Sequence, residues 1–114
     1  MFKFASERKK IKASNLRGGV GEAIREDVFS PEESLGKFEL CVVMTIPHGT
    51  SIGEHPHGPD GELYFVLSGT LRITDNGTTK DLQPGDAVFT GGGNAHSVVN
   101  VSGKDATMLA LVVH

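Results

Sequence analysis

The chain has 114 residues, which is enough for one domain with its own hydrophobic core and no need of disulfide bonds. Its formal net charge of -3 and pI near 5.9 give no electrostatic reason to expect binding to nucleic acid or to an anionic membrane, so we expect small-molecule or protein partners. The single cysteine excludes an internal disulfide, and no secretory leader or membrane-length apolar run is visible, so we expect a cytoplasmic protein.

Residues 1–20 mix basic side chains with Phe2 and Phe4 and show no sustained period of 2 or 3.6. We expect them to form an N-terminal arm and loop, ahead of a folded domain over residues 21–114. The basic residues could instead form an anion-binding patch, but short charge clusters are more often solvated. The glycine-rich run 17–21 neither follows a convincing strand nor opens a long helix, so a tight turn explains it better than a phosphate-binding loop.

From residue 19 onward, short runs of β-branched and aliphatic residues alternate with Gly, Pro, Asn and Asp at intervals of about ten residues. The chain also has 15 glycines in 114 residues, well above the usual share of about 7%. This pattern predicts an all-β fold. The expected strands cover residues 21–28, 37–46, 53–57, 62–68, 70–74, 78–82, 87–90, 96–100 and 106–113.

Two local signals predict how the chain turns between these strands. Asn76-Gly77 tolerates the positive φ angles of a two-residue hairpin, so the strands on either side of it should pair antiparallel. Ser30 followed by Pro31 and two acidic residues resembles a helix start, and Gly36 would end such a helix within two turns.

Two histidines lie two residues apart in the predicted strand 53–57. Residues i and i+2 of an extended strand point to the same face, so His55 and His57 should face the same way. Glu62 opens the next predicted strand, and a hairpin would return its carboxylate beside both imidazoles. Such ligands suit Mn, Fe, Co, Ni, Cu or Zn. His96 begins a later predicted strand and could reach inward as a fourth ligand.

The spacing of these residues resembles the two signature motifs of the cupin family, over residues 49–100. The first motif is matched throughout by Gly49, five residues, His55, one residue, His57, four residues, Glu62, six residues and Gly69. The second is matched by Gly85, five residues, Gly91, Gly93, two residues, His96, three residues and Asn100. Gly91 stands where the family pattern has Pro, and this departure touches a turn position rather than a ligand.

The resemblance implies a double-stranded β-helix, or jelly-roll barrel, of two antiparallel sheets. It also implies one divalent transition metal, of unknown identity, with His55, His57, Glu62 and His96 as its ligands. Four protein ligands on an octahedral metal would leave two positions open for a substrate. Bound imidazoles must be neutral and Glu62 ionised, so metal affinity should fall in acid.

Other side chains are candidates with ordinary alternatives. Tyr64 lies two residues beyond Glu62 on the same face and is the candidate catalytic residue, as a proton donor or substrate contact, although core packing explains it as well. Met44 could line the pocket. Three arginines could each pair with a substrate carboxylate, although surface positions explain them too: Arg17, Arg25 and Arg72. Four further polar residues are expected in exposed turns, loops or the terminus: His48, Glu54, Asp60 and His114.

Two functional hypotheses follow. The first is a metal-dependent enzyme acting on a small polar molecule such as a carboxylic acid or sugar derivative, by dioxygenase, decarboxylase, isomerase or lyase chemistry. No distinct lid carboxylate commits the chain to decarboxylation. The second is a non-catalytic binding or sensor protein that uses the same metal or pocket, and an apolar pocket without a second acid or base would favour it. Small cupins resemble one another in pairing, so we expect a homodimer, with Phe2 and Phe4 crossing to a neighbouring sheet edge.

Overall fold

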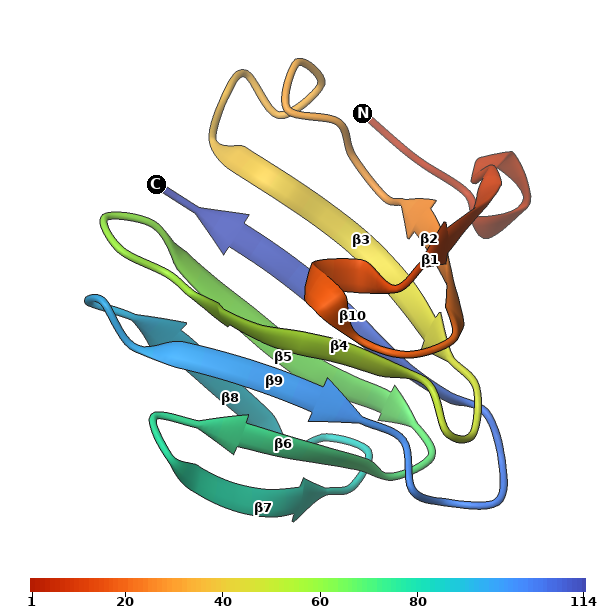
Figure 1. Cartoon of the computed structure of the whole chain (residues 1–114). Helices are drawn as coiled ribbons and strands as arrows, with labels where there is room; N and C mark the ends of the chain where they lie inside the picture. The colour runs from red at the N-terminus through yellow and green to blue at the C-terminus, as the bar shows by residue number, and fades with distance from the viewer.

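Two antiparallel sheets pack face to face and build the fold (Figure 1). The computed structural model describes residues 1–114. Its elements in chain order are η1 (Ala5–Glu7), β1 (Lys10–Ser14), η2 (Leu16–Gly18), β2 (Glu22–Asp27), β3 (Phe38–Ile46), β4 (Ser51–Pro56), β5 (Gly61–Ser68), β6 (Leu71–Asp75), β7 (Thr78–Leu82), β8 (Ala87–Gly91), β9 (Ala95–Val99) and β10 (Ala106–Val113). One sheet has the order β1-β2-β3-β10-β5-β8 and the other β4-β9-β6-β7. This is the all-β jelly roll that the sequence predicts.

The hydrophobic core lies between the two sheets. Side chains of a strand point alternately to its two faces, and β10 shows this most clearly because every second residue from Ala106 to Val112 is buried. Ile73 of β6 and Val98 of β9 meet that face from the opposite sheet and belong to the same core cluster. The inward faces of β4, β5 and β9 also carry polar side chains, and these form the site described below.

The nine predicted strands are all present, with ends displaced by at most two residues. The predicted hairpin is also present: β6 pairs with β7 in the register Leu71↔Leu82, and Asn76 and Gly77 have φ angles of 47° and 80°. Positive φ at both central residues is what a type I′ turn requires.

The predicted helix at residues 30–36 is wrong, because the segment forms hydrogen-bonded turns instead. Its capping box does form: the Ser30 backbone N–H donates to Glu33 Oε1 at 2.9 Å, and the Glu33 N–H donates to Ser30 Oγ at 3.1 Å. Leu35 and Gly36 then adopt φ angles of 58° and 73°, so the chain leaves the helical conformation before a second turn can close.

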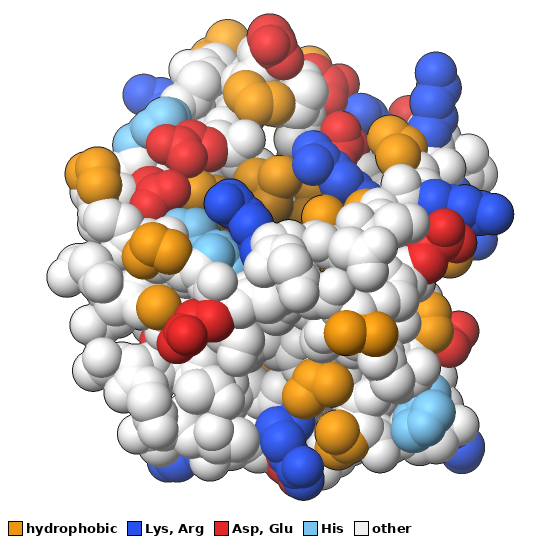
Figure 2. All heavy atoms as spheres, in the orientation of Figure 1, with side chains coloured by type: hydrophobic (Ala, Val, Ile, Leu, Met, Phe, Trp, Pro, Cys, Tyr) orange, Lys and Arg blue, Asp and Glu red, His pale blue; other side chains and the backbone are white.

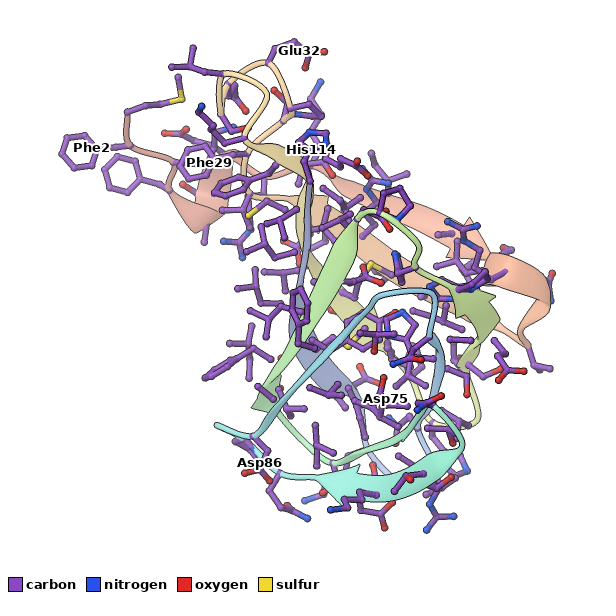
Figure 3. The ribbon with its side chains drawn as sticks, turned by 90° about the vertical axis from the view of Figure 1, so that its left-hand side faces the viewer. Phe2, Phe29, Glu32, Asp75, Asp86 and His114 are labelled. Carbon is purple, nitrogen blue, oxygen red and sulfur yellow. The ribbon has the colours of Figure 1, made fainter.

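The N-terminal segment contains a strand that the sequence did not predict. β1 pairs with β2 and forms one edge of the six-stranded sheet, in the register Ala13↔Ala23. Its residues are exposed or half-buried, so it shows no apolar alternation. Ahead of it, Phe2 projects from the same end of the molecule as Glu32 and His114, whereas Asp75 and Asp86 lie toward the other end (Figure 3). Neither of the two helical segments is long and apolar enough to cross a membrane.

Candidate metal centre

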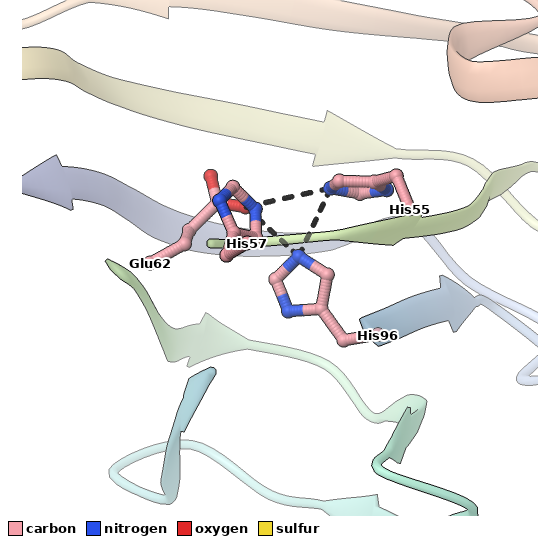
Figure 4. A group of neighbouring side chains, drawn as sticks. All are labelled: His55, His57, Glu62 and His96. Carbon is pink, nitrogen blue, oxygen red and sulfur yellow. Dashed lines mark hydrogen bonds and ion pairs between the residues drawn. The ribbon is translucent and has the colours of Figure 1, made fainter. Parts of the chain in front are cut away.

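Strand pairing and sheet packing bring together the four predicted ligands (Figure 4). His55 of β4 and His96 of β9 are direct partners in the ladder of the four-stranded sheet. His57 follows the end of β4, and Glu62 comes from β5 of the opposite sheet. All four side chains are buried. The cluster therefore spans the two sheets and exists only when the barrel is closed.

The donor atoms of the four side chains converge on one point. One ligand atom from each residue lies within 4.8 Å of the other three. Glu62 Oε1 is 3.0 Å from His57 Nε2 and 2.9 Å from His96 Nε2. The Nε2 atoms of His55 and His96 are 3.0 Å apart. Three imidazole nitrogens and one carboxylate oxygen thus point at a shared centre.

Hydrogen bonds to groups outside the cluster determine which nitrogen of the His55 and His57 rings presents a lone pair to this centre. Nδ1 of His55 lies 2.7 Å from the Gly53 carbonyl oxygen, which can only accept, so Nδ1 carries the proton and donates. Nδ1 of His57 likewise donates to Asp60 Oδ1 at 3.1 Å. In the neutral rings Nε2 therefore bears a lone pair, and this is the arrangement found when outer partners orient histidine ligands toward a metal.

A divalent transition metal fits these residues. Lone pairs of neighbouring donors repel one another at about 3 Å unless a proton or a cation lies between them. One cation at the centre would satisfy all four donors at once. Imidazole and carboxylate ligands together suit the first-row metals from Mn to Zn and leave the metal's identity open.

The carboxylate is already ionised in this environment. Burial alone would raise the pKa of Glu62, but when the facing rings are protonated the hydrogen bonds from His55 and His96 and the charges of His96 and His57 hold its pKa at about 2, and a cation bound in place of those protons would act in the same direction. Glu62 therefore offers an anionic oxygen at any pH near neutrality.

The ring of Tyr64 packs against the ring of His96. The two rings stack with centroids 4.4 Å apart and planes 11° from parallel. Nδ1 of His96 is buried with no hydrogen-bond partner, so the stacking on Tyr64 and the contacts of Nε2 within the cluster are what orient its ring. Burial raises the pKa of Tyr64, the charge of Glu62 adds to the rise, and the charge of Arg17 opposes it. The hydroxyl therefore stays protonated at neutral pH.

The cluster opens into a cavity of about 340 Å³ on the inner face of the six-stranded sheet. Hydrophobic side chains line most of it, including Met44, which the sequence placed there as a possibility. Figure 2 shows such a hollow, with hydrophobic side chains on its floor and histidine and basic side chains at its rim. The cavity wall contains Tyr64, three of the four cluster residues (His55, His57 and Glu62) and four further charged side chains: Arg17, Arg25, Glu39 and Asp60.

Several sequence candidates lie elsewhere or have another role. Arg72 forms an exposed ion pair with Asp81 at 2.8 Å, outside the cavity. His48 is exposed and contacts the Ser102 carbonyl. His114 pairs with Glu39 at 2.9 Å. Asp60, which the sequence assigned only to loop solvation, instead holds a ring of the cluster; an acidic residue three positions after a candidate ligand is the signal that could have indicated it.

Comparison with known proteins gives the family. Residues 42–113 match the cupin domain. The chain belongs to the cupin family. This cupin is 35% identical over 109 residues to "Oxalate-binding protein" of Thermotoga maritima. The alignment covers 96% of this chain and 90% of that protein.

The family explains the fold. A crystal structure of a "predicted oxalate decarboxylase" from Thermotoga maritima has a TM-score of 0.95 at 34% identity and covers 99% of this chain and 98% of that one. KdgF from Halomonas sp. has a TM-score of 0.81 at 18% identity, with 99% and 92% covered, and so shares the fold alone. The cupin jelly roll expected from the two motifs is therefore confirmed.

Proposed function

We propose that this cupin holds one divalent transition metal on His55, His57, Glu62 and His96 and acts as an enzyme on a small polar molecule. The observation that carries the proposal is the convergence of four buried donor atoms within 4.8 Å beside an open cavity. Substrates of this class include carboxylic acids and sugar derivatives, and the reactions include dioxygenase, decarboxylase, isomerase and lyase chemistry. The names of the two Thermotoga maritima relatives support a small-molecule ligand.

The metal, when bound, supplies Lewis-acid chemistry to a substrate oxygen. The chain supplies the rest of the site. Asp60 and the Gly53 carbonyl hold the rings of His57 and His55, so that the donors are oriented before a ligand arrives. The hydrophobic side chains of the cavity wall leave few polar groups to hold water beside a bound ligand. Tyr64 keeps its proton and, as the candidate catalytic residue, would donate an O–H hydrogen bond to a substrate oxygen that gains negative charge.

A non-catalytic binding or sensor protein is the second candidate. This candidate is favoured because every acidic side chain of the cavity wall is already paired with histidine. Glu39 pairs with His114, Asp60 with His57, and Glu62 with the histidines of the cluster. No acid of the cavity wall is thus left over to serve as a general base. The name "Oxalate-binding protein" of the relative describes binding alone.

Metal analysis of two variants tests the shared part of both candidates. Protein purified without added metal should contain close to one equivalent of a transition metal. His57→Ala and His96→Ala should lose it, whereas His48→Ala, an exposed histidine outside the cluster, should keep it. Unchanged stoichiometry in both cluster variants would overturn the metal site.

Turnover assays then separate the two candidates. Metal-loaded protein is incubated with small carboxylic acids and sugar acids, with and without dioxygen, and products are measured by mass spectrometry. The enzyme proposal expects product from at least one metal form and less product from Tyr64→Phe. Binding without product from any metal form would favour the sensor instead.

A further inference from the structure

One basic side chain of the cavity wall has no partner. Arg25 pairs with Asp27 at 2.8 Å, and the three acids in the wall are each paired with histidines. Arg17 also lines the cavity; it is an exposed residue, and it takes part in none of the ion pairs or side-chain hydrogen bonds of the chain. A guanidinium presents a planar fork of donors that matches a carboxylate, so an unpaired arginine in the wall of a ligand cavity is suited to bind an anionic group.

The backbone holds Arg17 at this position against its own preference. Its φ of 53° is in the left-handed region, which non-glycine residues seldom occupy. The loop is closed by hydrogen bonds from the Asn15 N–H to the Gly21 carbonyl at 2.9 Å and from the Asn15 side chain to the Gly19 carbonyl at 3.1 Å. Such a conformation persists only where surrounding structure imposes it.

The same loop is packed directly against the strand that carries His55. A Cβ atom at Gly53 of β4 would overlap the Arg17 carbonyl oxygen, and one at Gly19 would overlap the Ser51 carbonyl oxygen. Gly53 is also the residue whose carbonyl accepts the hydrogen bond from His55 Nδ1. One short stretch of β4 thus positions both a ring of the metal centre and the backbone of Arg17.

We propose that Arg17 receives a carboxylate of the ligand while another oxygen of the same ligand faces the metal centre, so that the ligand is a small dicarboxylate rather than a neutral sugar. This inference rests on the proposed metal site. The hydrophobic wall between these two polar ends accommodates the carbon chain of the ligand, and the cavity of about 340 Å³ is at the small end of ligand pockets.

Calorimetric binding to the Mn²⁺-loaded protein tests the inference. The probes are oxalate, malonate and succinate, each beside the monoacid with the same number of carbons: acetate, propionate and butyrate. Wild type should bind at least one diacid at least about tenfold more tightly than its monoacid. Arg17→Met should weaken binding of that diacid by about 10- to 100-fold, the range for a lost charged hydrogen bond, and leave binding of the monoacid nearly unchanged.

Two further variants exclude a merely structural effect. Arg72→Met makes the same chemical change at an arginine outside the cavity and should bind the diacid like wild type. Arg17→Lys keeps the charge without the fork and should recover part of the lost affinity. Mn²⁺ stoichiometry and thermal midpoint, measured for each variant, should stay at the wild-type values.

The outcomes separate this inference from the proposed function. If Arg17→Met retains the preference for the diacid, or if wild type shows none, Arg17 is not the carboxylate receptor, although the metal site stands as long as Mn²⁺ binds. If the His57 and His96 variants keep full metal stoichiometry, the proposed metal site fails and the inference fails with it.

Discussion

Asp60 is the side chain outside the cluster that orients a ring of the proposed metal centre. It accepts the hydrogen bond from His57 Nδ1 and so fixes which nitrogen of that ring faces the cluster. Removal of such an outer partner typically costs 10- to 100-fold in metal affinity. We therefore expect Asp60→Ala to bind metal about 10- to 100-fold more weakly, measured by competition with a chelating dye. Glu54→Ala removes an exposed acid from the adjoining strand and should bind like wild type.

The charge state of Glu62 predicts which groups make metal binding sensitive to acid. Its pKa is lowered to about 2, so it is ionised at every pH above that value and gains no proton between pH 7 and pH 5. Imidazoles do gain protons in this range, and a protonated ring cannot bind metal. Metal affinity should therefore fall from pH 7 to pH 5 with nearly the same slope in wild type and in Glu62→Gln, although the variant binds more weakly. A distinctly shallower slope in Glu62→Gln would contradict this assignment.

At the scale of elements, the contact between the Arg17 loop and β4 is the tightest constraint near the site. Gly53→Ala would force a Cβ into the Arg17 carbonyl, and this overpacking should cost about 1 to 3 kcal/mol in the free energy of unfolding. It should also weaken diacid binding, because the shift moves Arg17. Denaturant unfolding measures the first effect and calorimetry the second. Gly58→Ala lies in open space a few residues further along and should be nearly neutral in both.

The strands that the sequence predicted correctly are those marked by a pattern in neighbouring residues. β10 and the β6–β7 hairpin follow from alternation and from Asn76-Gly77, and their pairing partners confirm them. β1 was missed because an edge strand with exposed side chains has no alternating pattern. The helix expected between Ser30 and Gly36 did not form, because the chain turns into the left-handed region at Leu35, one residue before the glycine that was expected to end it.

The candidate site was likewise predicted from the sequence only in part. Residue spacing predicted the four cluster residues, since His55 and His57 share a strand face and the motif supplies Glu62 and His96. The sequence could not show that Arg17 lines the cavity and that Arg72 lies outside it. The position of Arg17 depends on the contact of residues 17–19 with residues 51–53. That contact is between segments far apart in the chain and leaves no local pattern.

At the scale of the whole molecule, the N-terminal arm carries the clearest sign of a partner surface. Phe2 and Phe4 are 89% and 64% exposed. Lys3 between them is held to the body, with Nζ 3.1 Å from Glu33 Oε2 and 5.7 Å from the centre of the Phe29 ring. The arm is therefore anchored while its aromatic side chains face solvent (Figure 3). Beside it, β1 is an edge strand, and the unpaired backbone groups of an edge strand are a template for pairing with another chain.

These features lead us to expect a homodimer in which each arm packs on the other chain. Light scattering at micromolar concentration should give about twice the 12.1 kDa chain mass. Phe2→Ser combined with Phe4→Ser should shift the protein toward the monomer, because exposed aromatic area is what the partner would bury. Val101→Ser also removes an exposed apolar side chain, but away from the arm, and should leave the dimer intact. A wild-type protein that is monomeric at this concentration would rule out the arm as a dimer contact. Since the four residues of the proposed metal site all come from one chain, metal stoichiometry per chain should not change between dimer and monomer.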